Sequence, residues 1–348
     1  RILIAARVAR EAQPVWASVI SGTDRRDWEV RAPPRRRWDR MVGMSDRRFY
    51  VIGAAGQLGN HLIETADGRP VTALTSADID LTDESSVWSA LAEVRRGDVI
   101  VNAAAYTAVD AAESDARTAF AVNADGPRSL AVVANERGAR LIHVSTDYVF
   151  AQPVRDVAGE PRPYEPTDPT GSPATVYGAS KLAGELSVRD ADPSVIVVRT
   201  SWVFTGRRGS ADFVATMARL EAERETLQVV DDQVGSPTYA RDLALGLWEL
   251  ADAVDGPSLR DGALLHACNA GSTTWNGLAR AVFAELGSDP ERVQPCTTDQ
   301  FPRPAPRPGY SVLSSESWAA AGLTPLRSWR DALHAAMTAR SGDDHPLR

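Results

Sequence analysis

A short apolar run, a glycine-rich turn and a helical pattern follow one another near residue 50, and this order restricts the possible folds. The apolar run is Phe49–Ile52, and the next residues, Gly53–Gly59, have the spacing G-x-x-G-x-x-G. A helical pattern continues from Leu58 to about Thr65. Glycines at a strand-to-helix turn let the backbone approach a pyrophosphate, whose charge lies at the helix N-terminus. The segment therefore predicts a first βα unit that binds a dinucleotide.

Strand-like runs alternate with helical patterns along most of the chain that follows. The predicted strands are Val71–Leu74, Asp98–Asn102, Leu141–Val144, Val195–Val198, Leu227–Val230 and Leu264–Cys268. The predicted helices are Asp83–Leu91, Asp115–Ala121, 123–137, Phe213–Glu225, Leu243–Ala253 and Leu278–Leu286. This alternation is typical of an α/β fold, a Rossmann-like doubly wound parallel sheet with helices on both faces.

Composition excludes several classes of protein. The formal net charge of −8 leaves no basic surplus to hold nucleic-acid phosphates. The two cysteines, Cys268 and Cys296, form no C-x-x-C motif, which argues against a disulfide framework or a zinc site and fits a reducing compartment. No apolar run reaches the roughly 20 residues that a membrane-spanning helix needs. We expect a cytoplasmic protein that binds neither nucleic acid nor membrane.

Residues 1–46 differ from the rest of the chain. They contain ten arginines and no regular apolar period, and Met41 and Met44 lie just before the first predicted strand. We interpret the segment as disordered, or as upstream sequence translated from a wrong start. A basic tail for an acidic partner is the alternative. Interspersed acidic residues argue against a transit peptide.

Lys181 is the only lysine among 38 lysines and arginines. This indicates a site that needs a compact ammonium rather than a planar guanidinium. Tyr177 stands four residues earlier, so on a helix the phenol and the ammonium share one face. A neighbouring cation lowers a phenol pKa from its usual value near ~10, which predicts a proton donor usable near neutral pH. The alternative is a chance Tyr-x-x-x-Lys pair on a surface helix.

Two predicted strands end in residues suited to a ligand site. The strand Asp98–Asn102 opens into Ala103–Thr107, whose small side chains leave room for a ligand at the carboxyl ends of the strands. The strand that contains His143 ends in Ser145–Phe150, whose hydroxyls would face the same crevice. We expect His143 itself to be a core residue with satisfied hydrogen bonds rather than a ligand.

The residues after the second predicted strand bear on the choice of dinucleotide. Thr75 and Ser76 follow that strand, and no immediate acidic residue is present to hold a ribose 2′-hydroxyl. NADPH and NADH are therefore equally possible. Asp80 and Leu81 lie where an adenine could be flanked. The alternative for Asp80 is a helix cap, a role that Thr82 would also play for the next helix.

Three side chains together predict a site for proton and hydride transfer. Tyr177 would give a proton to an oxygen, and Thr146 would hydrogen-bond the same oxygen. Lys181 would bind the cofactor ribose and keep the tyrosine pKa low, while the nicotinamide provides the hydride. A serine or threonine can also be an acyl nucleophile, but that needs a paired base and an oxyanion hole, and no G-x-S-x-G motif is present.

At this point the sequence resembles the extended short-chain dehydrogenase/reductases that act on nucleotide sugars, and more narrowly the dTDP-4-dehydrorhamnose reductase family. The resemblance covers roughly residues 48–340. The motifs that carry it are Gly53–Gly59, Val101–Asp110, Ser145–Phe150, Val176–Lys181, Arg199–Val203, Asp232–Thr238 and Gly271–Trp275. Many oxidoreductases share the first motif, whereas Arg-Thr-Ser-Trp and Asp-Gln-x-Gly-x-Pro-Thr are much more specific.

The resemblance implies the NAD(P)H-dependent reduction of the 4-keto group of dTDP-4-dehydro-L-rhamnose to dTDP-L-rhamnose. The implied catalytic residues are Tyr177 as the acid, Lys181 as the cofactor anchor, and Thr146. The implied cofactor-binding residues are Gly53, Gly56, Gln57, Leu58, Gly59, Asp80, Leu81, Ala103, Ala105, Tyr106, Thr107, Tyr177 and Lys181. The implied substrate-binding residues are Thr146, Asp147, Trp202 and Arg307, the last pairing with the diphosphate.

The resemblance also implies a division into domains. We expect an NAD(P)-binding domain over residues 47–200, which also receives about residues 229–268. A smaller, interleaved C-terminal substrate-binding part would comprise residues 201–228 and 269–340 and close over the dTDP. The proline-rich loop 151–175 links Thr146 to Tyr177, so we expect it to rim the site.

Two alternatives and one departure from the family accompany this interpretation. Some members of the family dimerise through magnesium-bound glutamates, but the matching positions here are His61 and Arg241, which would not hold magnesium. We therefore expect no metal, and a monomer or weak homodimer. One alternative function is a reductase or epimerase of another nucleoside-diphosphate sugar. The other is a non-catalytic protein similar to the regulatory subunit of methionine adenosyltransferase.

Overall fold

The computed structural model describes residues 47–342. The expectation of disorder or spurious translation for residues 1–46 lies outside this described part of the chain. Within residues 47–342, no helix is both long enough and apolar enough to cross a membrane.

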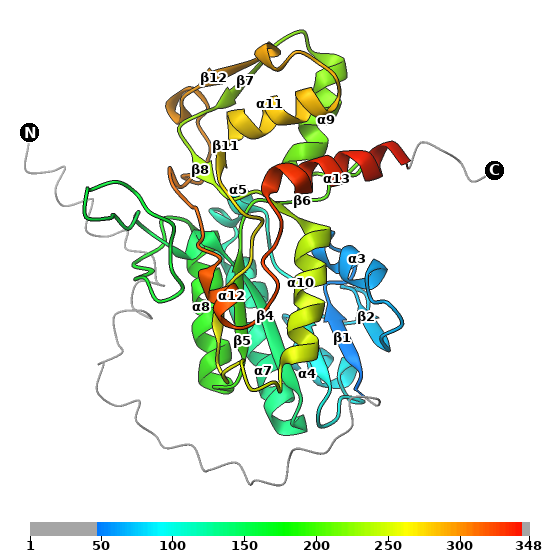
Figure 1. Cartoon of the computed structure of the whole chain (residues 1–348). Coiled ribbons are helices and arrows are strands. Elements are labelled where there is room, and N and C mark those ends of the chain that lie inside the picture. Colours follow the sequence, from blue (N-terminus) through cyan, green and yellow to red (C-terminus); the bar gives the residue numbers. More distant parts are fainter. Residues whose placement is uncertain (1–46, 343–348) are drawn as a thin grey trace, which may run out of the picture. The chain divides into compact units, whose positions relative to one another are not determined.

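A six-stranded parallel sheet forms the centre of the fold (Figure 1). In spatial order its strands are β10 (Leu264–His266), β5 (Ile196–Thr200), β4 (Arg140–Thr146), β3 (Val99–Asn102), β1 (Phe49–Ile52) and β2 (Val71–Leu74). The chain runs from β1 to β2 on one side and then crosses to β3 on the other. Such a switch point opens a crevice at the carboxyl ends of β1 and β3. The predicted doubly wound parallel sheet is confirmed.

One predicted strand is not part of this sheet. Leu227–Val230 forms β7, which pairs with β12 (Val293–Cys296) in a separate two-stranded sheet. Only Val229 of β7 is buried, whereas all four residues of β1 and of β3 are buried. Strands inside a sheet covered on both faces need apolar residues throughout, and β7 does not meet this requirement.

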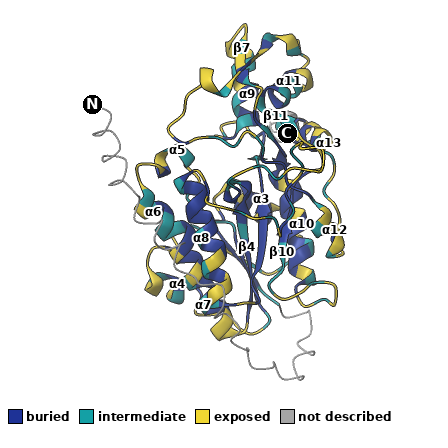
Figure 2. Cartoon of the chain, turned by 90° about the vertical axis from the view of Figure 1, so that its left-hand side faces the viewer, coloured by how far each residue is buried: buried dark blue, intermediate teal, exposed yellow. Residues whose placement is uncertain are grey.

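Helices cover both faces of the sheet, and their buried sides face it (Figure 2). One face packs against α3 (Gln57–Glu64) and α10 (Ala240–Ala253). The other packs against α4 (Glu84–Ala90), α7 (Gly126–Arg137) and α8 (Val176–Ala191). Successive residues of β1 alternate between the two cores, as the period of two in a strand requires.

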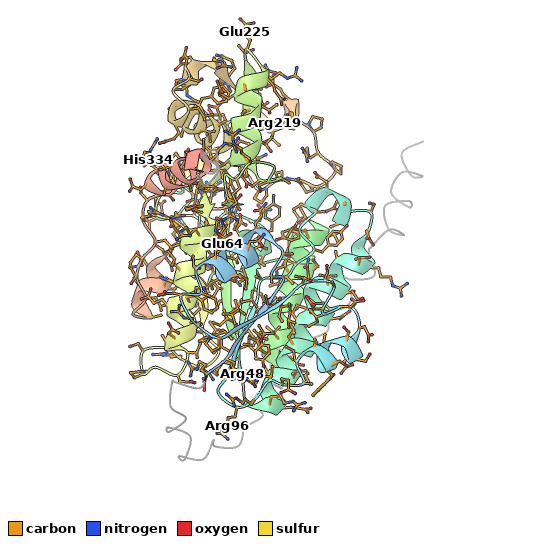
Figure 3. The ribbon with its side chains drawn as sticks, turned by 90° about the vertical axis from the view of Figure 1, so that its right-hand side faces the viewer. Arg48, Glu64, Arg96, Arg219, Glu225 and His334 are labelled. Carbon is orange, nitrogen blue, oxygen red and sulfur yellow. The ribbon has the colours of Figure 1, made fainter. Side chains whose placement is uncertain are left out.

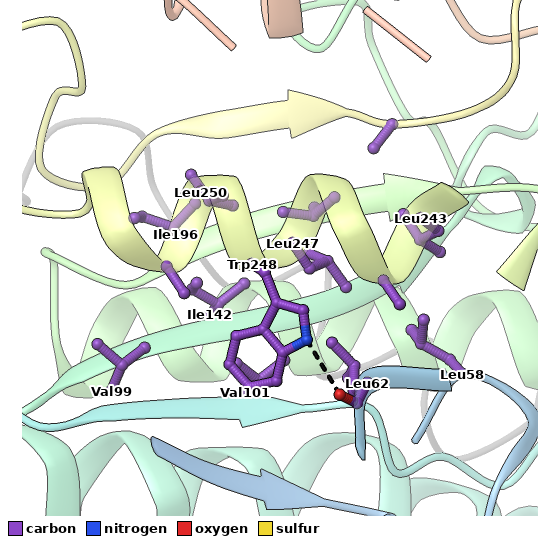
Figure 4. Packing of buried hydrophobic residues seen from close by; sticks show 14 of the residues in the cluster. Leu58, Leu62, Val99, Val101, Ile142, Ile196, Leu243, Leu247, Trp248 and Leu250 are labelled. Atoms are coloured by element: carbon purple, nitrogen blue, oxygen red, sulfur yellow. Dashed lines mark hydrogen bonds between the residues drawn. The ribbon is translucent and has the colours of Figure 1, made fainter. Parts of the chain in front are cut away.

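Contacts at the start of β1 and in the core behind it hold this strand and its covering helices in place. At the start of β1, Arg48, which Figure 3 labels, donates to the buried Asp98, with its backbone N–H at 3.0 Å from Oδ1 and Nη2 at 3.1 Å from Oδ2. In the core behind β1, the indole of Trp248 meets the ring of Phe49 edge-on with centroids 5.3 Å apart. Its Nε1–H donates to the carbonyl of Leu62 at 3.0 Å (Figure 4). These contacts fix α10 and α3 on the sheet.

A π-helical turn joins two helices that the sequence places apart. Between α6 (Ala116–Phe120) and α7 the chain forms a π-helix, η2 (Ala121–Asp125), so the helical path does not break at Asn123. The Asn123 side chain accepts from the N–H of Tyr106 at 2.8 Å and donates to its carbonyl at 3.1 Å. It also donates to Ser180 Oγ at 2.9 Å. Asn123 therefore ties the Tyr106 backbone to α8.

The C-terminal elements build a second core. The remaining helices and strands are α5 (Val109–Ala112), η3 (Asp147–Val149), β6 (Val203–Phe204), α9 (Phe213–Glu223), β8 (Val234–Gly235), β9 (Thr238–Tyr239), β11 (Thr273–Thr274), α11 (Trp275–Glu285), η4 (Pro290–Arg292), η5 (Thr298–Gln300), α12 (Glu316–Ala320) and α13 (Trp329–Gly342). Apolar side chains of α9, α11 and α13 pack together there. The sequence interpretation missed α12 and α13.

The long loop 151–175 is anchored to Arg199 of β5, which also pairs with α8. Arg199 of β5 forms a bidentate ion pair with Glu185 of α8, at 2.8 and 2.7 Å. The third guanidinium nitrogen, Nη1, donates to the carbonyl of Pro166 in the loop at 3.2 Å. Arg199 and Glu185 are only 2% and 3% exposed, so this is a buried charge pair. Ser145 adds a hydrogen bond to Glu185 at 2.6 Å.

Candidate active site

A cleft of about 1460 Å³ opens at the carboxyl ends of β1, β3, β4 and β5 and continues along the C-terminal elements. Its lining contains most of the predicted site residues. These are Gly53, Gly56, Gln57, Leu58, Asp80, Leu81, Ala103, Ala105, Thr107, Thr146, Asp147, Tyr177, Lys181 and Trp202. The structure therefore brings together side chains from segments that lie more than a hundred residues apart.

Three predicted site residues lie outside this lining. Gly59 packs under the glycine turn, and Tyr106 belongs to the apolar cluster around Tyr177. Arg307 lines a separate small pocket and pairs with Asp110 of α5 at 3.0 Å. In this structure the Arg307 guanidinium is therefore paired with Asp110, and the predicted pairing with a substrate diphosphate would have to replace or share this ion pair.

The glycine turn is shaped by close backbone contacts. A Cβ on Gly53 would lie 2.7 Å from the Ala104 backbone, and Gly53 has a φ of 80°, which favours glycine. A Cβ on Gly59 would lie 2.1 Å from the carbonyl oxygen of Gly53. The Gly56 N-cap gives α3 no side-chain hydrogen bond, so N–H groups at the helix start are left for a ligand. An uncapped N-terminus on a tight turn fits a dinucleotide pyrophosphate.

We expect Gly59→Ala to weaken cofactor binding and to lower the free energy of unfolding by about 1–3 kcal/mol, because the added methyl overpacks the turn. The Kd for NADPH and urea unfolding would measure both effects. Gly309→Ala is the matched control, since its Cβ would come no closer than 3.7 Å to any neighbour and its φ is not positive. An unchanged Kd in Gly59→Ala would show that the turn does not hold the cofactor.

The cleft end near Asp80 differs in detail from the prediction. Asp80 accepts hydrogen bonds from the N–H and hydroxyl of Thr82, at 2.8 and 2.7 Å. Asp83, not Thr82, caps α4 by accepting from the Ser85 N–H at 2.9 Å. The predicted capping role of Thr82 is wrong, because Thr82 turns back to Asp80 and the chain enters the helix one residue later.

Tyr177 lies in the first turn of α8, and Lys181 follows one turn later. Thr175 caps the helix by accepting from the Gly178 N–H at 2.9 Å. The ring of Tyr148 meets the Tyr177 ring edge-on with centroids 5.5 Å apart. Both predicted catalytic side chains on α8 line the cleft, next to Thr146. The expected common helix face is confirmed.

The electrostatics of this pair differ from the prediction. Burial raises the pKa of Tyr177 to about 12, and a hydrogen bond with Thr146 limits the rise. The ammonium of Lys181 donates to the carbonyl of Val144 at 2.8 Å and does not lower the Tyr177 pKa. The predicted lowering of the phenol pKa by Lys181 is therefore wrong for this structure. Lys181 points its charge at β4 instead.

Burial lowers the pKa of Lys181 to about 8, and the nearby Glu185 carboxylate limits this drop. Lys181 is charged below that pH and loses its charge as pH rises through it. We therefore expect kcat/KM for the cofactor, which reports groups of the free enzyme, to fall above about pH 8. Tyr177 ionises far higher and does not cause this limb. If kcat/KM instead began to fall only near the ordinary lysine pKa of ~10.4, the assignment of this fall to a buried Lys181 would be contradicted.

Asp147 adds a buried carboxyl next to Thr146. Its Oδ1 accepts from the Thr146 hydroxyl at 2.9 Å, whereas its Oδ2 has no hydrogen-bond partner among the described residues. Burial raises the pKa of Asp147 to about 6, and the neighbouring hydroxyls of Ser311 and Thr146 limit this rise. A buried acceptor without a partner is costly, and a ligand hydroxyl would satisfy it.

Trp202 occupies a constrained position in the cleft wall. Its φ of 46° is unusual for a residue other than glycine, and such conformations cluster at functional sites. The indole stacks on Trp275, with centroids 3.5 Å apart and ring planes 6° apart. Trp275 also lines the cleft. The motif Gly271–Trp275 carries the family resemblance, but the sequence does not indicate the contact with Trp202, because only the fold brings α11 to that residue.

His143 and His61 are both buried. His143 Nδ1 lies 3.0 Å from Asn102 Nδ2, while its Nε2 has no partner among the described residues. The predicted core histidine is thus confirmed as buried but is only half satisfied. The Nδ1 atom of His61 lies 3.2 Å from Oε2 of Glu64. Across residues 47–342, no group of three or more His, Cys, Asp or Glu side chains could hold a metal ion.

Comparisons with known proteins, by sequence and by structure, point to one family. The family described as the RmlD substrate binding domain matches residues 47–341. A dTDP-4-dehydrorhamnose reductase of Mycobacterium tuberculosis is 55% identical over 302 residues, which cover 86% of this chain and 95% of that protein. One of Mycolicibacterium smegmatis is 50% identical over 305 residues, covering 86% of this chain and 89% of that protein.

A solved structure supports the same relationship. The dTDP-4-dehydrorhamnose reductase of Bacillus anthracis, crystallised in complex with NADP, has a TM-score of 0.73 and 34% identity, covering 84% of this chain and 99% of that one. The resemblance read from the sequence motifs is confirmed. The chain therefore belongs to the family described as the RmlD substrate binding domain, the family of these dTDP-4-dehydrorhamnose reductases.

Proposed function

We propose that this protein is an NAD(P)H-dependent reductase that converts the 4-keto group of dTDP-4-dehydro-L-rhamnose to the alcohol, giving dTDP-L-rhamnose. The single observation that carries the proposal is the meeting of Thr146, Tyr177 and Lys181 with the glycine turn in one cleft. Relatives of the same family name supply the substrate class.

The residues of the cleft fit a nicotinamide dinucleotide. Gly53, Gly56 and the start of α3 would hold the pyrophosphate, and Asp80 and Leu81 would flank the adenine. Ala103, Ala105 and Thr107 line the same cleft and would contact the dinucleotide. When bound, the reduced nicotinamide supplies the hydride that reaches the carbonyl carbon. The residues after β2 are compatible with either NADPH or NADH.

Each catalytic side chain then has one task. Tyr177 donates its phenol proton to the carbonyl oxygen as that oxygen gains charge. Thr146 donates a hydrogen bond to the same oxygen and orients the ketone. Lys181 holds the ribose of the dinucleotide with its ammonium. Asp147 accepts a hydrogen bond from a sugar hydroxyl, and Trp202 packs against the sugar.

A coupled assay tests the proposal. An upstream enzyme would generate the dTDP-keto sugar, and oxidation of NADPH would be followed. We expect rapid oxidation with the dTDP-keto sugar and slow oxidation with GDP- and UDP-linked keto sugars. Faster turnover of another nucleotide sugar would change the proposed substrate. The absence of turnover with every keto sugar would refute the proposed reductase activity.

We also propose the division into an NAD(P)-binding domain, residues 47–200 with about 229–268, and a substrate-binding part. The entry of β10 into the main sheet and the separate core of α9, α11 and α13 support it. The strands β7, β8 and β9 pair with β12, β11 and β6 of the substrate-binding part, which favours a boundary near residue 240 rather than 229. A cytoplasmic monomer or weak homodimer completes the proposal, and the free cysteines Cys268 and Cys296 fit a reducing compartment. Light scattering at several concentrations would test the oligomeric state.

A further inference from the structure

The cleft carries few positive charges for the ligands that the proposed function assigns to it. Among the described residues that line it, the cations are Lys181, Arg207 and Arg208. The dinucleotide and the sugar nucleotide each bring a diphosphate. Lys181 directs its ammonium to the Val144 carbonyl at 2.8 Å, so the two arginines are the cations of the lining that remain to be assigned to phosphate charge.

The two arginines belong to one loop, residues 205–212, here called the arginine loop. Asp212 closes its base, because its Oδ2 accepts from the N–H and the hydroxyl of Thr205, at 3.0 and 2.6 Å. Arg340 of α13 donates to the carbonyl of Gly206 at 2.9 Å. A loop that is held at its base and along one side presents its tip at a defined place.

The tip of the arginine loop contacts α3, the helix that follows the glycine turn, and also lines the cleft. Arg207 forms an ion pair with Glu64, the last residue of α3, which Figure 3 labels. The next residue, Arg208, is exposed and lines the cleft together with Ser210. The first residues of α3 line the same cleft. A guanidinium, a hydroxyl and backbone N–H groups are suitable donors for phosphate oxygens.

We propose that the arginine loop is a second phosphate-binding element of the cleft. In it, Arg208 binds a nucleotide phosphate, and Arg207 fixes the loop to α3 through Glu64. The inference rests on the proposed function for the choice of ligands. The phosphate belongs to the dinucleotide or to the diphosphate of the sugar nucleotide, which offer the same chemistry to a guanidinium.

The test measures Kd by calorimetry for NADPH, NADH and dTDP in the full chain and in Arg208→Gln. We expect binding of at least one of these nucleotides to weaken about tenfold or more, because charge-assisted hydrogen bonds are strong. Arg208→Lys, which keeps the charge but loses the fork, should weaken binding less. The matched control is Arg219→Gln, an exposed arginine on α9 that pairs with Glu223 at 2.6 Å and lies apart from Glu64 (Figure 3).

The pattern of losses identifies the phosphate. A larger loss for NADPH than for NADH indicates the 2′-phosphate, equal losses indicate the pyrophosphate, and a loss for dTDP alone indicates the sugar nucleotide. Kd values that stay within about twofold for all three probes would overturn the proposal. Because no turnover is measured, a chain that binds through Arg208 yet reduces no keto sugar contradicts only the proposed function.

Discussion

Replacing Tyr177 by phenylalanine is expected to lower kcat by about 10²–10⁴-fold, the usual contribution of a positioned general acid. The phenol of Tyr177 is buried in the cleft beside Thr146. Phenylalanine keeps the ring and its edge-on contact with Tyr148. The loss would therefore come from the missing proton and not from repacking.

Two measurements separate this result from a general defect. The Kd for NADPH should change little in Tyr177→Phe, because the ring still fills its position. Tyr50→Phe provides the matched control, since Tyr50 is a buried tyrosine on the sheet face opposite to α3 and should keep its turnover. If kcat of Tyr177→Phe stayed near that of the parent, another group would have to supply the proton.

The second large effect concerns stability. We expect Arg199→Met to lower the free energy of unfolding by about 3–5 kcal/mol, because it leaves the Glu185 carboxylate buried without its cation. The same change removes the hydrogen bond to the Pro166 carbonyl, so the loop 151–175 should become easier to cleave. Urea unfolding at constant pH and limited proteolysis would measure the two consequences.

A double variant tests the physical reason. Replacing Arg199 and Glu185 together by methionine removes both charges and should recover much of the lost stability, as apolar replacements of buried ion pairs do. The exposed pair Arg219–Glu223 serves as the comparison, and Arg219→Met should cost no more than about 0.5 kcal/mol. If the double variant were as unstable as the sum of the single ones, the cost would lie in packing.

Much of the fold was predictable because most strands of the central sheet are short, mainly apolar runs, which in β1, β3 and β5 are buried at every residue. Strands such as β1 and β2 begin and end where the sequence indicates. The π-helix Ala121–Asp125 was not predictable, since its single extra residue leaves the helical pattern almost unchanged. By contrast, α13 carries the spacing of an amphipathic helix at Trp329, Leu333, Ala336 and Met337, and that signal was available.

The candidate site shows the same limit. The glycine turn, Thr146 and the Tyr177–Lys181 pair were found because strand ends and helix spacing bring them together locally. The stacking of Trp202 on Trp275 and the ion pair between Arg307 and Asp110 join residues far apart in the sequence. No local pattern encodes such pairs. The direction of the Lys181 ammonium was missed for a related reason, because the Val144 carbonyl comes from another element.

Because Lys181 is the only lysine, cleavage of the chain at lysine can measure the opening of α8. A protease that cuts only after lysine has one target bond in the 348 residues, the bond after Lys181. Lys181 lies inside α8 and is only 2% exposed. Cleavage therefore requires this helix to open, and it yields two fragments of similar size, 1–181 and 182–348. A brief digestion would count open molecules directly, in every variant that keeps Lys181 and with each nucleotide added.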